Sequence, residues 1–229
     1  MPAQQRLRVT FGKGRPIQYV SHLDLCLAWE RALRRAGAPV SYSQGFNPQP
    51  RLQLAAALPV GYTSRAELMD VFLDQPLAVA GFIADVSAVL PAGLAVIAVQ
   101  PVELGAPSLQ STLRQAEYQV TVETSLPAEE LAGRIAALLA ADQFEQERVR
   151  KRQVERFDLR PLVDDVRLEG AGAGQVELWM RVSAGARGNV RPESVLAGLG
   201  LAGTYAQIER TRLVFEFDSL PYSGYNYRL

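Results

Sequence analysis

The part of this sequence that decides its fold is residues 21–51, SHLDLCLAWERALRRAGAPVSYSQGFNPQPR. The apolar residues at the spacing of one helical face are Leu25, Trp29, Ala32, Leu33 and Ala36. This pattern predicts a helix over residues 22–36. Ser21 has the position of an N-cap, and Gly37 stands where a helix of this length would end. We therefore expect a capped amphipathic helix that leads into a short strand.

A stiff polar loop follows at residues 44–51, QGFNPQPR. Prolines reduce the entropy lost when a loop is held in one shape, so this composition favours a binding loop. Phe46 could stack on a base or ring, and Gln44 and Asn47 could contact its polar edge. Arg51 could hold a phosphate or carboxylate. The competing interpretation is a rigid turn that covers the end of a sheet.

Basic residues are concentrated near the N-terminus. Residues 1–60 contain eight Lys and Arg against two Asp and Glu, although the whole chain has a net charge of zero. This asymmetry suggests a local anionic partner. We expect one concave, positive surface, bordered by loop 44–51, by the helix residues Arg31, Arg34 and Arg35, and by the turn at residues 188–191. The expected ligand- or RNA-binding residues are Lys13, Arg15, Arg31, Arg34, Arg35, Tyr42, Gln44, Phe46, Asn47, Arg51, Arg187, Asn189 and Arg191.

Residues able to perform catalysis are few. His22 is the only histidine, and as a neutral imidazole it could act as a general base on a ribose hydroxyl, or it could be a structural residue beside the cap. Asp24 could be an acid or a cation ligand, but its spacing from Ser21 also explains it as part of the cap. The single cysteine, Cys26, excludes an internal disulfide and any Cys-rich zinc or iron–sulfur site, so no bound metal is expected.

The chain in order suggests one unit used twice. The first half alternates strands and helices as βαββαβ, with helices at residues 22–36 and 79–90 and strands at 7–11, 67–73 and 94–99. Its second strand starts at residues 40–42, is interrupted by the loop and continues at residues 52–58. A Gly/Pro/Ser break follows at residues 103–108. The second half has strands at residues 117–123, 176–182 and 207–217, and a strand pair at residues 144–154 and 157–168. It has a helix at residues 127–141, and residues 190–194 lead into a short helix that ends at about residue 199. The predicted fold class is α+β, with two ferredoxin-like domains in tandem at residues 1–104 and 109–229.

One family resemblance is specific. Residues 19–73, from YVSHLDLCLAWERALRR through SQGFNPQPR to AELMDVFL, resemble the signature of the radical-SAM-linked family, domain of unknown function 2344. The likeness extends over about residues 6–75, and GNVRPESVLAGLG at residues 188–200 is similar to the family's second landmark. The family's loop usually reads Asn-Pro-His-Pro, and this chain has Gln49 in place of the histidine. This difference argues against an indispensable imidazole in the loop. Such proteins occur adjacent or fused to a cobalamin-binding radical SAM protein.

The resemblance implies a partner rather than a reaction. We expect a non-catalytic substrate-binding protein, with RNA as substrate, that works with a radical SAM enzyme in RNA modification or maturation. This chain would bind no cofactor, and the partner would carry S-adenosylmethionine, an iron–sulfur cluster and cobalamin. The alternatives are an RNA-processing enzyme of the CRISPR endoribonuclease-like or pseudouridine synthase-like fold type using His22 or Asp24, and a protein-binding adaptor.

The location follows from what the sequence lacks. No apolar run reaches the roughly 18 residues of a membrane span, and residues 1–8 are polar and basic without the apolar core of a signal peptide. We therefore expect a cytoplasmic protein with no membrane association. The sequence leaves its oligomeric state open.

Overall fold

The computed structural model of this chain describes residues 3–150, 153–186 and 188–216. The chain divides into two compact units, unit 1 (Met1–Leu113) and unit 2 (Arg114–Leu229). The break expected at residues 103–108 lies within unit 1. There it leads into the short helix α3 (Leu109–Thr112).

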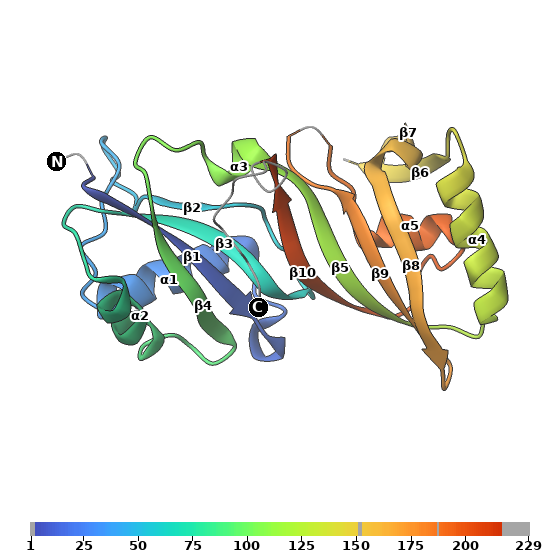
Figure 1. Cartoon of the computed structure of the whole chain (residues 1–229), viewed down its shortest axis with the longest axis horizontal. Coiled ribbons are helices and arrows are strands. Elements are labelled where there is room, and N and C mark those ends of the chain that lie inside the picture. The colour runs from blue at the N-terminus through green and yellow to red at the C-terminus, as the bar shows by residue number, and fades with distance from the viewer. Residues whose placement is uncertain (1–2, 151–152, 187, 217–229) are drawn as a thin grey trace. The chain divides into compact units, whose positions relative to one another are not determined.

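Unit 1 is an antiparallel sheet with helices packed against it (Figure 1). Its strands and longer helices are β1 (Gln5–Lys13), α1 (His22–Arg35), β2 (Leu52–Leu54), β3 (Thr63–Leu73), α2 (Val79–Ser87) and β4 (Leu94–Val102). The strand order is β4-β1-β3, with β2 on the other side of β3. β1 is antiparallel to both β3 and β4, and β2 is antiparallel to β3. The order of elements is therefore βαββαβ, with the first strand between the third and the fourth.

The alternation in β1 separates the two faces of this sheet. The fully buried residues of β1 that join the helix-side core are Leu7, Val9 and Phe11. The ring of Phe11 meets Trp29 of α1 edge to face, with ring centroids 4.9 Å apart. α2 contributes Phe82 and Val86 to the same core. Arg6 and Arg8 consequently lie on the opposite face of the sheet.

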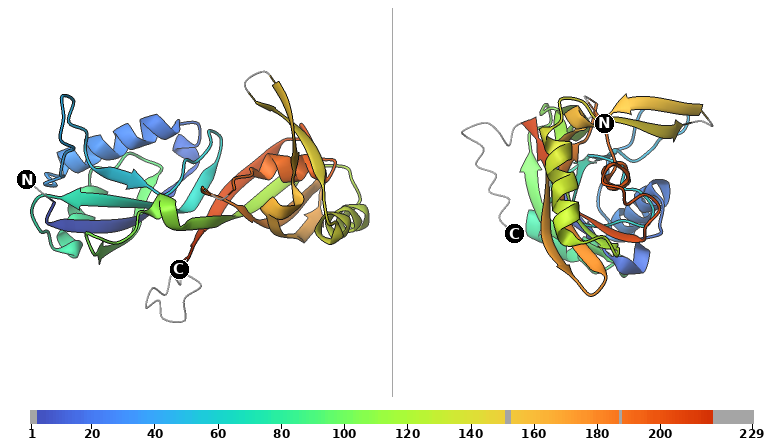
Figure 2. Two further views of the ribbon diagram at one scale, coloured as in Figure 1. Left: turned by 90° about the horizontal axis from the view of Figure 1, so that it is seen from above. Right: turned by 90° about the vertical axis from the view of Figure 1, so that its right-hand side faces the viewer.

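Unit 2 repeats this order of elements with one additional hairpin. Its elements are β5 (Leu113–Glu123), α4 (Ala128–Ala140), β6 (Glu145–Arg150), β7 (Gln153–Asp158), β8 (Val163–Gly172), β9 (Gln175–Ser183), α5 (Pro192–Gly198) and β10 (Ala206–Phe215). The strand order is β10-β5-β9-β8, in which β9 is antiparallel to β5 and to β8. β6 and β7 form a separate antiparallel pair that projects from the unit in Figure 2.

The structure confirms the mixed α+β fold and the helix expected after Ser21. One prediction was wrong, because residues 144–154 and 157–168 do not form a single strand pair. The β6–β7 pair ends at Asp158, and a 3-10 turn, Arg160–Leu162, separates it from β8. Pro161 in this turn lacks an N–H and has a fixed φ, which interrupts the strand. Within the residues that the structure describes, no helix is both long enough and apolar enough to cross a membrane.

Candidate functional site

The loop after α1 is held by a hydrogen-bonded stem. The Ser41 amide donates to the Phe72 carbonyl at 2.8 Å, which attaches the stem to β3. The Arg51 amide donates to the Ser41 carbonyl, and the Ser43 amide donates to the Gln49 carbonyl, both at 2.8 Å. The stem therefore fixes both ends of the tip, residues 44–48.

The tip projects from unit 1 into solvent, as the left view of Figure 2 shows. Phe46 is fully exposed, so its ring contributes nothing to the core. The amide side chains of Gln44 and Asn47 are exposed beside it. An anchored loop thus presents one aromatic ring and two amides that folding alone does not require.

Next to this loop, α1 ends in a cluster of cations. The Ala38 amide donates to the Leu33 carbonyl at 3.0 Å and the Gly37 amide to the Arg34 carbonyl at 3.1 Å, which is a Schellman motif. Arg34 and Arg35 lie in the last turn, where they complement the helix dipole. Arg31, Arg34 and Arg35 are exposed, and no ion pair to any of them is found among the described residues.

Replacing Gly37 with Ala should destabilise the protein, because Gly37 has a φ of +68° and an added Cβ meets nothing within 4 Å. The loss of stability then comes entirely from holding an alanine in the left-handed backbone conformation, which costs about 1–2 kcal/mol. Gly81→Ala in α2 is the matched control, since its Cβ also meets nothing but its φ is helical. That change should stabilise the protein by about 0.5–1 kcal/mol. Urea denaturation of both variants measures the two changes in stability, which should have opposite signs. Equal changes in stability would contradict this account.

A pocket of about 300 Å³ lies between α1 and the strand-like segment that follows it. Its polar lining comes from Glu30 and Arg34 of α1 and from Tyr42. The remaining lining residues are Leu33, Gly37, Ala38, Pro39, Val40 and Pro50. The pocket thus brings together Arg34 and Tyr42, two of the residues expected to bind a ligand.

Other expected binding residues lie elsewhere in the fold. Lys13 is a correction to the expected set, because it is buried and its ammonium donates to the carbonyls of Gln18, Val20 and Tyr62 at 2.8, 3.1 and 3.3 Å. Its charge therefore stabilises the turn around η1 (Arg15–Ile17) and is not available to a ligand. The Arg51 guanidinium lies over the Phe72 ring, 4.3 Å from the centroid.

The remaining expected binding residues are exposed or lie outside the described residues. Arg15 is exposed in unit 1. Asn189 and Arg191 are located just before α5 in unit 2, where both are exposed, and their place on one surface with the unit 1 loop stays a prediction. Arg187 lies outside the described residues.

The two candidate catalytic residues are next to the start of α1. The Asp24 amide donates to Ser21 Oγ at 3.2 Å, and that hydroxyl donates to Asp24 Oδ2 at 2.7 Å, so the carboxylate is used in the cap. His22 Nε2 lies 4.0 Å from Cys26 Sγ, and within the described residues His22 Nδ1 has no hydrogen-bond partner. Burial raises the pKa of the Cys26 thiol and the charge on Glu30 raises it further, which keeps the thiol protonated.

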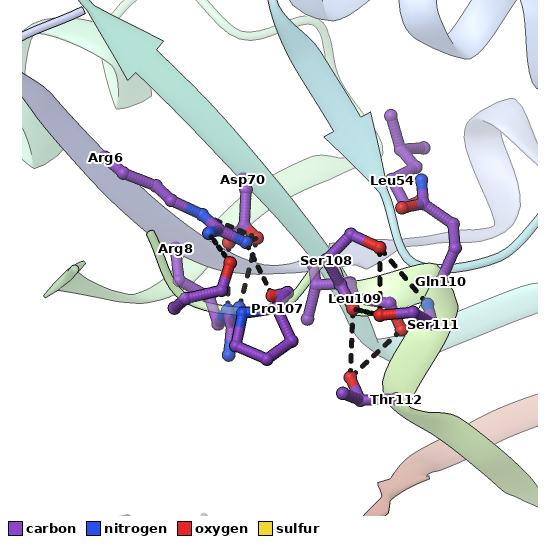
Figure 3. Close-up of polar contacts among 11 residues, drawn as sticks. Arg6, Arg8, Leu54, Asp70, Pro107, Ser108, Leu109, Gln110, Ser111 and Thr112 are labelled. Carbon is purple, nitrogen blue, oxygen red and sulfur yellow. Dashed lines mark hydrogen bonds and ion pairs between the residues drawn. The ribbon is translucent and has the colours of Figure 1, made fainter. Parts of the chain in front are cut away.

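Sequence reasoning missed a buried ionic cluster on the face of the unit 1 sheet opposite the helices (Figure 3). Asp70 of β3 accepts hydrogen bonds from Arg6 and Arg8 of β1, at distances from 2.6 to 3.1 Å. Arg6 also donates to the carbonyls of Ala106 and Pro107 at 2.6 and 3.0 Å. The cluster attaches the segment before α3 to the sheet, and the alternation of β1 was the signal that placed both arginines on this face.

A second missed group lies on β8 and β9 of unit 2. The guanidinium groups of Arg167 and Arg181 lie 4.8 and 5.2 Å from the Trp179 ring centroid. Both cations are already paired, Arg181 with Glu117 at 2.8 Å and Arg167 with Asp165 at 2.5 Å. The paired charges make this group a poorer site for an anion than the α1 arginines, for which the described residues provide no ion pair.

A family comparison identifies one match for the chain. The model described as "Uncharacterized protein conserved in bacteria (DUF2344)" matches residues 6–192. A search of curated proteins found no significant match.

Solved structures are similar to this chain at low sequence identity. A chain in the crystal structure of a Cbf5-Nop10-Gar1 complex is 12% identical, with a TM-score of 0.50 over 91% of this chain and 48% of that one. A chain in an H/ACA RNP bound to a substrate RNA containing 2'-deoxyuridine is also 12% identical, with a TM-score of 0.46 over 91% of this chain and 47% of that one. This chain therefore spans about half the length of these structural relatives.

Proposed function

We propose that this chain, which belongs to the bacterial family DUF2344, binds a single-stranded segment of RNA with the loop and helix end of unit 1 and performs no chemistry itself. The observation that carries this proposal is the combination of Arg31, Arg34 and Arg35, which lack ion pairs among the described residues, with the fully exposed ring of Phe46. Arginines supply phosphate contacts, and an aromatic ring accepts an unstacked base.

The pairing of other cations supports this assignment. Several other described basic residues use their charged groups in hydrogen bonds or ion pairs within the protein. They include Arg6, Arg8, Lys13, Arg134, Arg156, Arg160, Arg167 and Arg181. Arg31 and Arg35 have i, i+4 spacing on α1, at which like charges repel one another and lower stability. An anionic ligand would remove that cost.

Loop anchoring supports the role of Phe46. The stem holds the tip in place before a ligand arrives, so less entropy is lost on binding. Stacking on such a ring is tolerant of base identity, whereas a paired duplex offers no accessible base face. A flexible single strand is therefore the form of RNA that this site fits best.

We also infer that both units are ferredoxin-like. Each has the order βαββαβ, and in each the first strand lies between the third and the fourth when the β6–β7 hairpin is set aside. The similarity to a chain of the Cbf5-Nop10-Gar1 complex supports a shared fold, and it assigns no residue here. A superposition of the two units in an experimental structure would test this inference.

The arginines and Phe46 should affect RNA binding in different ways. Replacing Arg31, Arg34 and Arg35 with Ala should flatten the plot of log affinity against log salt by about 0.7 for each phosphate that these arginines neutralise. Phe46→Ala should weaken binding by about 1–3 kcal/mol and leave that slope unchanged, because stacking releases no counterions. Fluorescence anisotropy with an unstructured oligoribonucleotide, at several salt concentrations, measures both quantities.

Two variants serve as controls for this experiment. Arg156→Ala removes an exposed arginine that is paired with Glu147 at 3.0 Å, and Tyr205→Ala removes an exposed aromatic ring of unit 2. Neither should change binding. If the unmodified protein failed to bind the oligonucleotide at low salt, the proposal would fall and the protein-binding adaptor would become the leading alternative.

We further propose that the bound RNA is presented to a radical SAM enzyme. The proposal rests on the resemblance of residues 6–75 and on the presence of a single cysteine, which leaves the cluster, S-adenosylmethionine and cobalamin to a partner. Purification of the native protein with and without ribonuclease tests it. A radical SAM protein should be recovered in both samples, and its absence from both would count against the partnership.

A further inference from the structure

We propose that the pocket between α1 and Tyr42 selects an unpaired guanine base, an inference that rests on the proposed RNA-binding function. The pocket volume of about 300 Å³ is at the lower end of ligand-binding cavities. It suits one base with part of its ribose. The loop ring of Phe46 and the cations of α1 would hold the neighbouring nucleotides.

Glu30 supplies the selectivity. Its carboxylate only accepts hydrogen bonds, and it lines the pocket half-buried. The Watson–Crick edge of guanine presents two adjacent donors, N1–H and the N2 amino group, which match two carboxylate oxygens. Adenine and cytosine place one amino donor beside an acceptor, and uracil places one N–H between two carbonyls. Only guanine therefore donates to both carboxylate oxygens without also placing a hydrogen-bond acceptor against the carboxylate.

The carboxylate is also uncommitted. Glu30 and Arg34 have the i, i+4 spacing that favours an ion pair on a helix. No ion pair or hydrogen bond of the Glu30 carboxylate is found among the residues that the structure describes. Both side chains thus line one pocket without neutralising each other, which leaves an acceptor for the base and a cation for its phosphate.

The other walls suit a planar ring. Tyr42 is 48% exposed and lines the pocket together with Pro50, to which its backbone is bridged. Leu33, Pro39 and Val40 add apolar side chains to the lining. A base inserted here would contact the Tyr42 ring and aliphatic groups of the lining, while its polar edge reaches Glu30.

The test compares oligouridines that carry one central substitution. By fluorescence anisotropy, a single guanine should bind about tenfold more tightly than a single adenine, the size expected for a paired set of hydrogen bonds. Inosine lacks the N2 amino group and should lose most of this gain. 7-Deazaguanine keeps the Watson–Crick edge and should retain it.

The protein variants test the role assigned to Glu30. Glu30→Gln introduces an amide donor and should reduce the guanine preference to less than about threefold. Glu103→Gln changes an exposed glutamate of unit 1 outside the pocket lining and should leave the preference intact. Thermal denaturation shows whether each variant remains folded, and the inosine comparison needs no variant.

The outcomes separate this inference from the proposed function. Binding of all oligonucleotides with equal affinity, or a guanine preference that survives both inosine and Glu30→Gln, would overturn guanine selection and leave RNA binding in place. Failure to bind any of them would overturn the proposed function itself. Both guanine selection and RNA binding would be supported if the guanine preference were lost with inosine and with Glu30→Gln but kept with Glu103→Gln.

Discussion

Replacing Asp70 with Asn should destabilise the protein by about 3–5 kcal/mol, because it removes the carboxylate to which two buried guanidinium groups donate. Asp70 is 0% exposed, and Arg6 and Arg8 are 2% and 7% exposed. Both arginines donate through Nε and a terminal nitrogen to this one carboxylate. Asn keeps the shape of the side chain but removes the charge and one acceptor. The loss would be a large fraction of the roughly 5–15 kcal/mol that stabilises a typical domain.

Urea denaturation followed by circular dichroism measures this loss. Asp85→Asn is the matched control, because Asp85 is exposed on α2 and its replacement should change stability by less than about 0.5 kcal/mol. A loss below about 1 kcal/mol for Asp70→Asn would contradict a desolvated cluster. The result matters for function, since the cluster holds the segment before α3 through the Arg6 contacts to Ala106 and Pro107.

Replacing Trp29 with Ala should have a comparable effect, about 3–5 kcal/mol. Trp29 is 0% exposed and fills the space between α1 and β1, where it meets Phe11 edge to face. Removing the indole leaves a cavity at the centre of the unit 1 core. Because α1 also carries Glu30 and Arg34, loosening this contact should disturb the pocket as well.

Trp29→Phe distinguishes packing from polarity. Trp29 Nε1 is buried and has no hydrogen-bond partner within the described residues, so burial of the indole N–H carries an uncompensated cost. Phe removes that donor together with part of the ring volume, and the two effects oppose each other. We expect a loss of about 1 kcal/mol, measured by thermal or urea denaturation. A loss equal to that of Trp29→Ala would show that Nε1 has a partner, such as an ordered water.

Helix and strand positions in this protein were predictable because their signals are local. The cap formed by Ser21 and Asp24 and the stop at Gly37 appear at the expected ends of α1. The alternation of β1 indicated which of its residues face the core. The β6–β7 hairpin was not separated from β8 because charged alternating residues on both sides of Pro161 give the same strand signal.

The candidate site was only partly predictable. The loop composition and the arginines of α1 pointed to the region of the proposed RNA site, and they placed Phe46 and Arg34 among the candidates. Glu30 was not among them, since a glutamate within an amphipathic helix carries no local sign of lining a pocket. It gains that role from Tyr42 and Pro50, which the stem of the loop brings to α1.

By itself, the sequence determined the elements: the caps and periodicity of α1, the faces of β1, and the stiffness of the loop after α1. Only the tertiary structure decided which charges are available to a ligand. Pairing of β1 with β3 brings Asp70 to Arg6, 64 residues away, and the turn around Lys13 surrounds its ammonium with carbonyls. Whether a cation is buried and paired or exposed and unpaired depends on residues distant in the chain, whereas periodicity and capping depend on neighbours within a few residues.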